Sequence, residues 1–187
     1  MDMLSAYAEA IHRNQLRVDV VGTDQLSDPT PCTDWDVHAL IGHIIAGYQM
    51  FATACGTAPA AGGTSVTARE LAAAHRAAAS GALSAFSSPN AMQQIVQLPV
   101  GAVPGSVALG LALTDAVVHG WDLAKATGQD LSIEEGLAAM LLAGAQDSIG
   151  PDMRQPGGVM PVFAQPIAVA PDRPSGEHLV AFLGREP

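Results

Sequence analysis

The stretch over residues 106–127 constrains the fold more than any other part of the chain, because it is apolar on nearly all sides yet holds ionisable residues near its centre. Pro104 and Gly105 open this stretch and Gly128 closes it, as expected of a helix. A helix that is apolar all round is buried in a core. Asp115 lies in the middle of this one, and a buried carboxylate without a partner is costly. The sequence therefore predicts that Asp115 is paired, protonated or bound to a metal.

Two further ionisable residues follow Asp115 on the same helical face. His119 lies four residues on and Asp122 three residues after that, so their side chains share a face. The unit D-x-x-x-H places a carboxylate oxygen and an imidazole nitrogen where a single cation could meet both. A buried Asp–His pair can equally form a structural hydrogen bond, so the spacing alone leaves both readings open.

A second apolar helix, predicted over residues 35–55, carries one histidine, His43, in the run LIGHIIA. Gly42 and Gly47 cost helix stability but allow a neighbouring helix to approach closely. If the two helices face each other, His43 completes a three-ligand set with the aspartate and histidine above. Taken alone, such a histidine can instead be a core residue that is satisfied by a hydrogen bond.

Two histidines and one carboxylate, with other coordination positions open, are typical of a catalytic metal site and not of a closed structural one. Zinc (Zn2+) is the first expectation for this set. A facial set of this type also suits Fe(II) (Fe2+), and Ni(II) (Ni2+) stays open. We expect Asp122 to orient His119 through its other ring nitrogen, although a backbone carbonyl could do the same.

Composition and periodicity both favour an all-α fold with little strand. Aromatic residues make up only 4% of the chain, so the core must be aliphatic and rich in alanine, which has the highest helix propensity. Helical spacing of apolar residues recurs over residues 1–25, 35–55, 67–86, 106–127 and 132–149. Four long helices of similar length predict an antiparallel four-helix bundle, with room for one crossover after the second or third helix. A short strand or extended arm is expected over residues 94–100.

The character of the chain changes after Gly150. Prolines at positions 151, 156, 161, 166, 171 and 174 exclude a long helix. We expect an extended segment with one or two short strands near Val162 and Ile167, and a short helix over residues 175–183. The predicted domains are a helical, metal-binding bundle over residues 1–150 and a proline-rich C-terminal extension over residues 151–187, packed on the bundle.

Charge and hydropathy narrow the class of partner. The formal net charge is −10 and the eight Lys and Arg residues form no run, which argues against a nucleic-acid partner. The most apolar stretch, residues 103–118, is interrupted by Asp115 and is too short to span a bilayer. The N-terminus has no long apolar run of the signal-peptide kind. We therefore expect a cytoplasmic protein without a membrane partner. A homodimer is a possible assembly, since dimers are the commonest one.

The remaining cysteines and histidines carry weaker expectations. Cys32 and Cys55 make no disulfide framework and suit a reducing compartment. Cys32 lies beside prolines in a loop, and the sequence shows no neighbouring base or cation that would activate it, so a packed thiol is expected. Four histidines lie in polar surroundings and are expected at the surface: His12, His38, His75 and His178.

Several segments together resemble a known family. Residues 29–35, PTPCTDW, are followed by LIGH at residues 40–43, and residues 115–128 read DAVVHGWDLAKATG. These segments are similar to the DinB-like superfamily, and more closely to the mycothiol-dependent maleylpyruvate isomerase metal-binding domain group. The C-terminal run LVAFLGREP, residues 179–187, resembles the ending of an actinobacterial subfamily of that group.

The resemblance implies a four-helix bundle that holds a metal, usually zinc, with His43, Asp115 and His119. The corresponding acid in the isomerase is a glutamate, so the shorter aspartate here implies a metal closer to its helix or more loosely bound. The resemblance also implies mycothiol as a thiol cosubstrate, with an electrophilic small molecule as the second substrate. Arg185 is a candidate for binding a substrate anion.

The resemblance leaves the reaction open between several classes. The isomerase has a larger C-terminal domain, whereas only residues 151–187 follow the fifth predicted helix here. The first expectation is a mycothiol-dependent transferase or isomerase. The alternatives are a non-catalytic module that binds a metal or a small molecule, and a hydrolase that uses metal-activated water.

Overall fold

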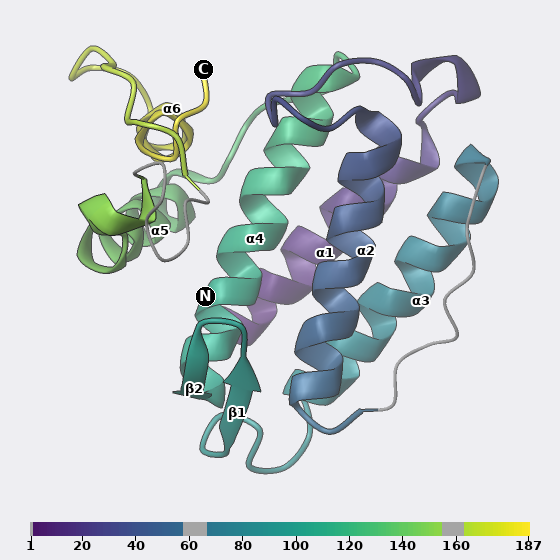
Figure 1. Ribbon diagram of the computed structural model, residues 1–187, viewed down its shortest axis with the longest axis vertical. Helices are drawn as coiled ribbons and strands as arrows, with labels where there is room; N and C mark the ends of the chain where they lie inside the picture. The colour runs from purple at the N-terminus through teal and green to yellow at the C-terminus, as the bar shows by residue number, and fades with distance from the viewer. Residues whose placement is uncertain (1, 58–66, 155–162) are drawn as a thin grey trace. The chain divides into compact units, whose positions relative to one another are not determined.

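The computed structural model describes residues 2–57, 67–154 and 163–187 (Figure 1). By its internal contacts the chain divides into two units, Met1–Asp130 and Leu131–Pro187. The sequence places the domain boundary after residue 150 instead, at the start of the proline-rich segment. The connector expected between the second and third helices falls at residues 58–66, outside the described residues.

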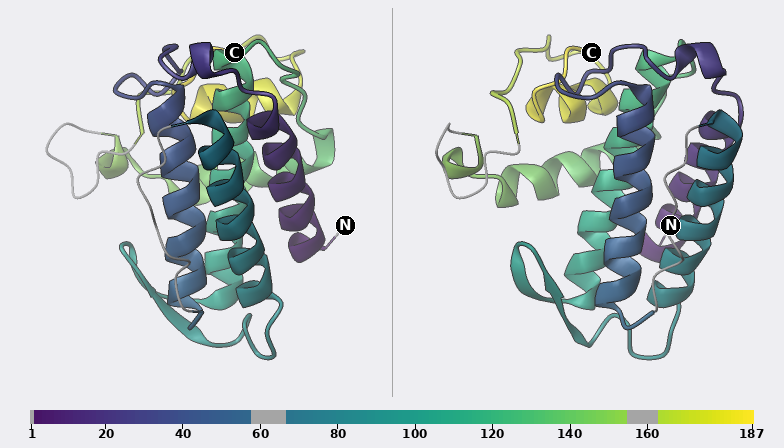
Figure 2. Two further views of the ribbon diagram at one scale, coloured as in Figure 1. Left: turned by 90° about the vertical axis from the view of Figure 1, so that its right-hand side faces the viewer. Right: turned by 45° about the vertical axis from the view of Figure 1, so that its right-hand side comes forward.

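Four helices make up the first unit: α1 (Met3–Asp19), α2 (Val37–Ala54), α3 (Ala68–Phe86) and α4 (Gly105–Ala126). Each of α1 and α2 packs against both α3 and α4, and Figures 1 and 2 show the four axes side by side. A short 3-10 turn, Thr23–Gln25, lies between α1 and α2. The predicted mainly helical bundle is confirmed.

Ring contacts fix the directions of the helices. Tyr7, near the start of α1, meets Phe86 at the end of α3, with ring centroids 5.5 Å apart, so these helices are antiparallel. Phe51, near the end of α2, also lies 6.2 Å from Phe86, so α2 and α3 are parallel. The predicted antiparallel order therefore does not hold between α2 and α3, because α2 ends at the opposite end of the bundle from the start of α3. The one crossover for which the prediction leaves room falls between these two helices.

The starts of the bundle helices carry local signals. Thr67 and Glu70 form a capping box, in which the Thr67 hydroxyl accepts from the Glu70 N–H at 3.2 Å and the Glu70 carboxylate accepts from the Thr67 N–H at 3.1 Å. Asp36 caps α2 by accepting from the Ala39 N–H at 2.8 Å. Such caps define where each helix begins.

Among the four bundle helices, α4 contributes the most buried residues to the core. Among the described residues it is the one helix long and apolar enough to cross a membrane, and 72% of that apolar window is buried inside the protein. The buried core helix of a protein can be as long and as apolar as a membrane-spanning helix. The helix predicted over residues 106–127 is confirmed, and it is longer than its most apolar stretch because it continues past Asp115 to Ala126.

A two-stranded antiparallel sheet precedes α4. Its strands are β1 (Ile95–Leu98) and β2 (Gly101–Pro104), with Ile95 opposite Pro104 and Leu98 opposite Gly101. The first strand agrees with the arm expected over residues 94–100. The second strand was not expected, because Pro104 and Gly105 indicate only the start of a helix. Gly101 turns the chain with a φ of +111°, a conformation that glycine adopts without strain.

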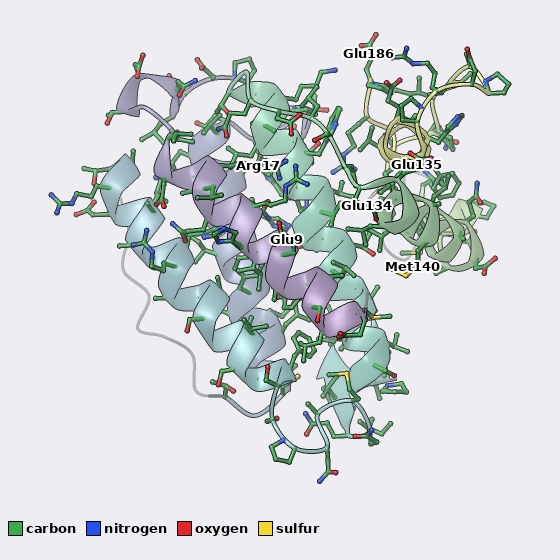
Figure 3. The ribbon with its side chains drawn as sticks, turned by 180° about the vertical axis from the view of Figure 1, so that it is seen from behind. Glu9, Arg17, Glu134, Glu135, Met140 and Glu186 are labelled. Atoms are coloured by element: carbon green, nitrogen blue, oxygen red, sulfur yellow. The ribbon has the colours of Figure 1, made fainter. Side chains whose placement is uncertain are left out.

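The second unit contains α5 (Glu135–Ser148), a 3-10 turn (Pro151–Met153) and α6 (Ser175–Phe182). The Glu134 carboxylate caps α5 by accepting from the N–H groups of Gly136 and Leu137 at 2.9 and 2.7 Å. Figure 3 shows Glu134 and Glu135 together at this helix start. The Ser175 hydroxyl at the start of α6 donates to the Glu135 carboxylate at 2.6 Å, so the first turns of the two helices are joined.

The predicted short helix over residues 175–183 is confirmed by α6. A strand near Ile167 is wrong, since residues 164–170 have no regular secondary structure. The Ile167 N–H donates instead to the Ala181 carbonyl oxygen at 2.9 Å, which ties this extended segment to α6. The strand expected near Val162 falls outside the described residues.

Close packing of α1 on α4 depends on a glycine. Asn14 is fully buried, and its amide nitrogen donates to the Ala116 carbonyl oxygen at 2.7 Å and to the Tyr48 hydroxyl at 3.3 Å. Its amide oxygen accepts from Arg17 at 3.2 Å, and Figure 3 shows Arg17 on α1 beside α4. A Cβ added at Gly120 would collide with this Asn14 oxygen.

Gly120→Ala is expected to destabilise the bundle by about 1–3 kcal/mol, because the added methyl group overpacks the contact with Asn14. Gly110→Ala on the same helix is the matched control, since its Cβ would meet Met3 Sδ at an ordinary 3.8 Å. That change should be neutral or stabilise by up to about 1 kcal/mol through helix propensity. Urea unfolding measures both values, and equal midpoints for the two variants would contradict the expected close contact.

His75 is fully buried, so its expected surface position is wrong. It shares the inward face of α3 with Leu71, Ala78 and Ala82, which are also buried and follow helical spacing. Its Nδ1 lies 2.8 Å from Gln15 Oε1, whereas its Nε2 has no hydrogen-bond partner among the described residues. Burial disfavours the charged ring and lowers the pKa of His75 to about 4.

The depressed pKa of His75 predicts a loss of stability in acid. Between pH 6.5 and 4 the unfolded chain binds more protons at this residue, so the unfolding free energy falls as the pH falls through that window. Through His75 alone, the unfolding free energy falls by about 3 kcal/mol between pH 7 and pH 4. Urea unfolding across this range should show a shallower pH dependence for His75→Gln than for the wild type. Identical slopes would show that the ring does not titrate in this way.

Candidate functional site

The structure brings His43, Asp115 and His119 together between α2 and α4. Asp115 Oδ1 lies 3.8 Å from His43 Nε2 and 3.5 Å from His119 Nε2. The two imidazole rings meet edge to face, with centroids 4.7 Å apart. One donor atom from each of the three side chains lies within 4.8 Å of the others. The residues therefore meet as expected from the sequence, and their binding of a metal stays a prediction.

This cluster is partly open to solvent. The side chains of His43, Asp115 and His119 are 37, 26 and 12% exposed. Solvent therefore reaches the cluster, most of all at His43, while His119 is largely buried. Such a half-open arrangement is typical of sites that bind ligands, and less typical of closed structural sites.

A glycine allows α2 to approach the carboxylate. A Cβ at Gly47 would lie 3.1 Å from Asp115 Oδ2, tighter than most side-chain contacts. A Cβ at Gly42 would have nothing within 4 Å. Both glycines were expected to permit close approach, and only Gly47 does so.

Trp35 covers the cluster from the loop that precedes α2. Its ring lies 4.3 Å from the ring of His43 and is tilted by 33°, and it lies 5.9 Å from the ring of His119. A partly stacked aromatic ring restricts the motion of an imidazole. Trp35 therefore contributes a wall beside both histidines.

Asp122 lies on the side of His119 away from Asp115. Its Oδ2 is 3.0 Å from His119 Nδ1, and its side chain is fully buried. This is the contact expected of a carboxylate that orients a histidine ligand. With a proton on Nδ1, His119 donates to Asp122 and leaves the Nε2 lone pair facing Asp115.

Cys32 belongs to a second group of donor atoms, with His119 and Asp122. Its Sγ lies 3.3 Å from Asp122 Oδ2 and 3.9 Å from His119 Nδ1. No base adjoins this thiol in the sequence, because its partners lie about 90 residues further along the chain. The position of Cys32 inside PTPCTDW was the one signal that could have pointed to it.

Arg185 lies in the second unit. Its guanidinium donates to the carbonyl oxygen of Leu183 at 2.9 Å, a contact that holds it near the end of α6. Its expected role in binding a substrate anion stays a prediction.

Comparisons with known proteins agree with the motifs. The family model of the mycothiol maleylpyruvate isomerase N-terminal domain matches residues 7–124. This range contains the whole cluster. Two uncharacterized proteins of Mycobacterium tuberculosis, from strains CDC 1551 and H37Rv, are each 39% identical over 187 residues, covering 99% of this chain and 98% of their own length. No solved structure matches the chain at a significant level. The family model covers more than half of the sequence, so the chain belongs to the mycothiol maleylpyruvate isomerase N-terminal domain family.

Proposed function

We propose that the protein binds one divalent cation through His43, Asp115 and His119, with zinc preferred over nickel or iron. We further propose that this centre serves thiol-dependent chemistry, as a transferase or isomerase that uses mycothiol or a similar small thiol. The single observation that carries the proposal is the convergence of two imidazole nitrogens and one carboxylate oxygen from two adjacent helices. The family match supports the choice of thiol.

The donor set fits a zinc-sized ion. Bonds of about 2.0–2.1 Å at a tetrahedral angle put neighbouring ligand atoms about 3.3 Å apart. Asp115 Oδ1 lies 3.5 and 3.8 Å from the two histidine nitrogens, so each separation needs to close by only a few tenths of an ångström. Both distances exceed the 2.7–3.2 Å of a good N–H···O hydrogen bond, which favours a shared cation over direct pairing.

Charge also favours an anionic additional ligand. Two neutral imidazoles and one carboxylate offset one of the two positive charges of a divalent ion. When bound, zinc would supply a Lewis acid with open positions that favours the thiolate form of a thiol at neutral pH. The protein's own part is to hold His119 with Nε2 toward the centre through Asp122, and to shield His43 with Trp35.

The first test is the metal content of protein purified without chelators. We expect about one divalent ion per chain in the wild type, measured by inductively coupled plasma mass spectrometry. Asp115→Ala and His119→Ala should lose it, because each removes one of three protein ligands. His12→Ala is the control, since His12 is exposed on α1 and lies outside both donor groups. A metal-free wild type, or full retention in both ligand variants, would contradict the proposal.

The second test is turnover. Metal-loaded protein incubated with mycothiol and a panel of electrophiles should show S-transfer or isomerisation that disappears without the thiol and in His43→Ala. The reason is that the thiol is activated only where all three ligands hold the cation. Equal activity in thiol-free buffer would instead identify a hydrolase. Metal binding without any turnover would identify a non-catalytic binding module, and either result would overturn the thiol-dependent proposal.

A further inference from the structure

The loop over residues 26–36 touches both histidines of the cluster, and its own hydrogen bonds hold its shape. The Thr30 hydroxyl donates to the Trp35 carbonyl oxygen at 2.8 Å and accepts from the Cys32 N–H at 3.1 Å. The Trp35 N–H donates to the Cys32 carbonyl oxygen at 2.8 Å. At the base of the loop, the Val37 N–H donates to the Asp28 carbonyl oxygen at 3.0 Å. The side chains of Cys32 and Trp35 are thus presented from one rigid turn.

Two donors converge on one oxygen of a buried carboxylate. Asp122 Oδ2 lies 3.0 Å from His119 Nδ1 and 3.3 Å from Cys32 Sγ. The Asp122 side chain is 0% exposed, so each donor to it matters, because a buried carboxylate that lacks hydrogen bonds is strongly disfavoured. A thiol is a weak donor, but at 3.3 Å it is within reach of this oxygen.

We propose that Cys32 is a positioning residue for the metal centre. Its thiol donates to Asp122 and holds the carboxylate in the orientation that keeps the proton of His119 on Nδ1, with Nε2 turned toward Asp115 and His43. This assigns a role to a residue that the proposed function does not use. Its consequence for metal affinity rests on that function, whereas its consequence for the His119 ring does not.

A competing geometry is a cation held directly by Cys32, His119 and Asp122, whose donor atoms also lie close together. That ion would need His119 Nδ1 as its ligand. The 3.0 Å separation of Nδ1 from Asp122 is hydrogen-bond length, whereas Nε2 lies 3.5 Å from Asp115. The contacts therefore place the proton on the Asp122 side of the ring and the coordinating lone pair on the other side.

The first measurement uses metal-free protein and nitrogen-15 NMR of the His119 ring, at a pH where the ring is neutral. The wild type should show the tautomer with the proton on Nδ1. Cys32→Ala and Asp122→Asn should populate the other tautomer, and Cys32→Ser, which keeps a hydroxyl donor, should lie between Cys32→Ala and the wild type. Cys55→Ala is the matched control, because Cys55 ends α2 and lies outside both donor groups. A wild-type tautomer in Cys32→Ala would overturn the proposal.

The second measurement is Co²⁺ affinity by chelator competition, with visible spectra of the same samples. Loss of a residue that supports a metal ligand typically weakens metal binding 10–100-fold, so we expect about tenfold for Cys32→Ala and more for Asp122→Asn. The Cys32→Ser variant should bind more tightly than Cys32→Ala, and Cys55→Ala should match the wild type. Urea unfolding of each variant checks that it is folded.

The outcomes separate this inference from the proposed function. A thiolate-to-cobalt charge-transfer band in the wild type that is absent in Cys32→Ser would make Cys32 a ligand and overturn its positioning role. Unchanged affinity in Cys32→Ala, with binding abolished in His119→Ala, would overturn the positioning role and leave the metal centre standing. A wild type that binds no Co²⁺ but shows the expected tautomer shifts would support the positioning role and count against the metal centre.

Discussion

The burial of ionisable groups on α4 is the constraint that the rest of the first unit must satisfy. Asp115, His119 and Asp122 lie on a helix whose other buried residues are apolar or glycine, and a carboxylate in such surroundings needs partners. Each aspartate has a partner from a different element. His43 of α2 lies beside Asp115, and the thiol of Cys32, in the loop before α2, donates to Asp122. His119 lies between them and faces both. The polar cluster thus dictates where α2 and the loop must pack.

Close packing of α2 against α4 is what allows the cluster to form. A single histidine on α2 approaches two residues that lie one turn apart on α4. Gly47 then lets the backbone of α2 approach the Asp115 carboxylate, where a larger side chain would crowd it. The shorter aspartate, which has one methylene fewer than a glutamate, suits this close approach of the helices.

The sequence predicted what depends on local pattern and missed what depends on distant contacts. Helical periodicity and caps located α1 to α6 to within a few residues, except that the predicted first helix ran on past the end of α1. His43 and Asp115 stood out because each is a polar residue in an apolar helix. The partners of Cys32 and of His75 lie 90 and 60 residues away, so no local pattern reports them. His75 shows the difficulty clearly, since Arg76 and the alanines around it in the sequence do not report that its helical face is buried. Helix direction and the second strand of the hairpin likewise depend on tertiary packing.

The cluster lies wholly within residues 32–122, inside both the first unit and the range of the family match. The residues that would hold a cation, orient its ligands and shield them are therefore supplied by one compact unit. The family match ends at residue 124 and the second unit begins at Leu131, so α5 and α6 lie outside the part of the chain that the family defines. The proposed metal centre thus draws all of its donor residues from the first unit. Differences in substrate among relatives are then to be sought first in the open side of the cluster and in the segments outside the matched range.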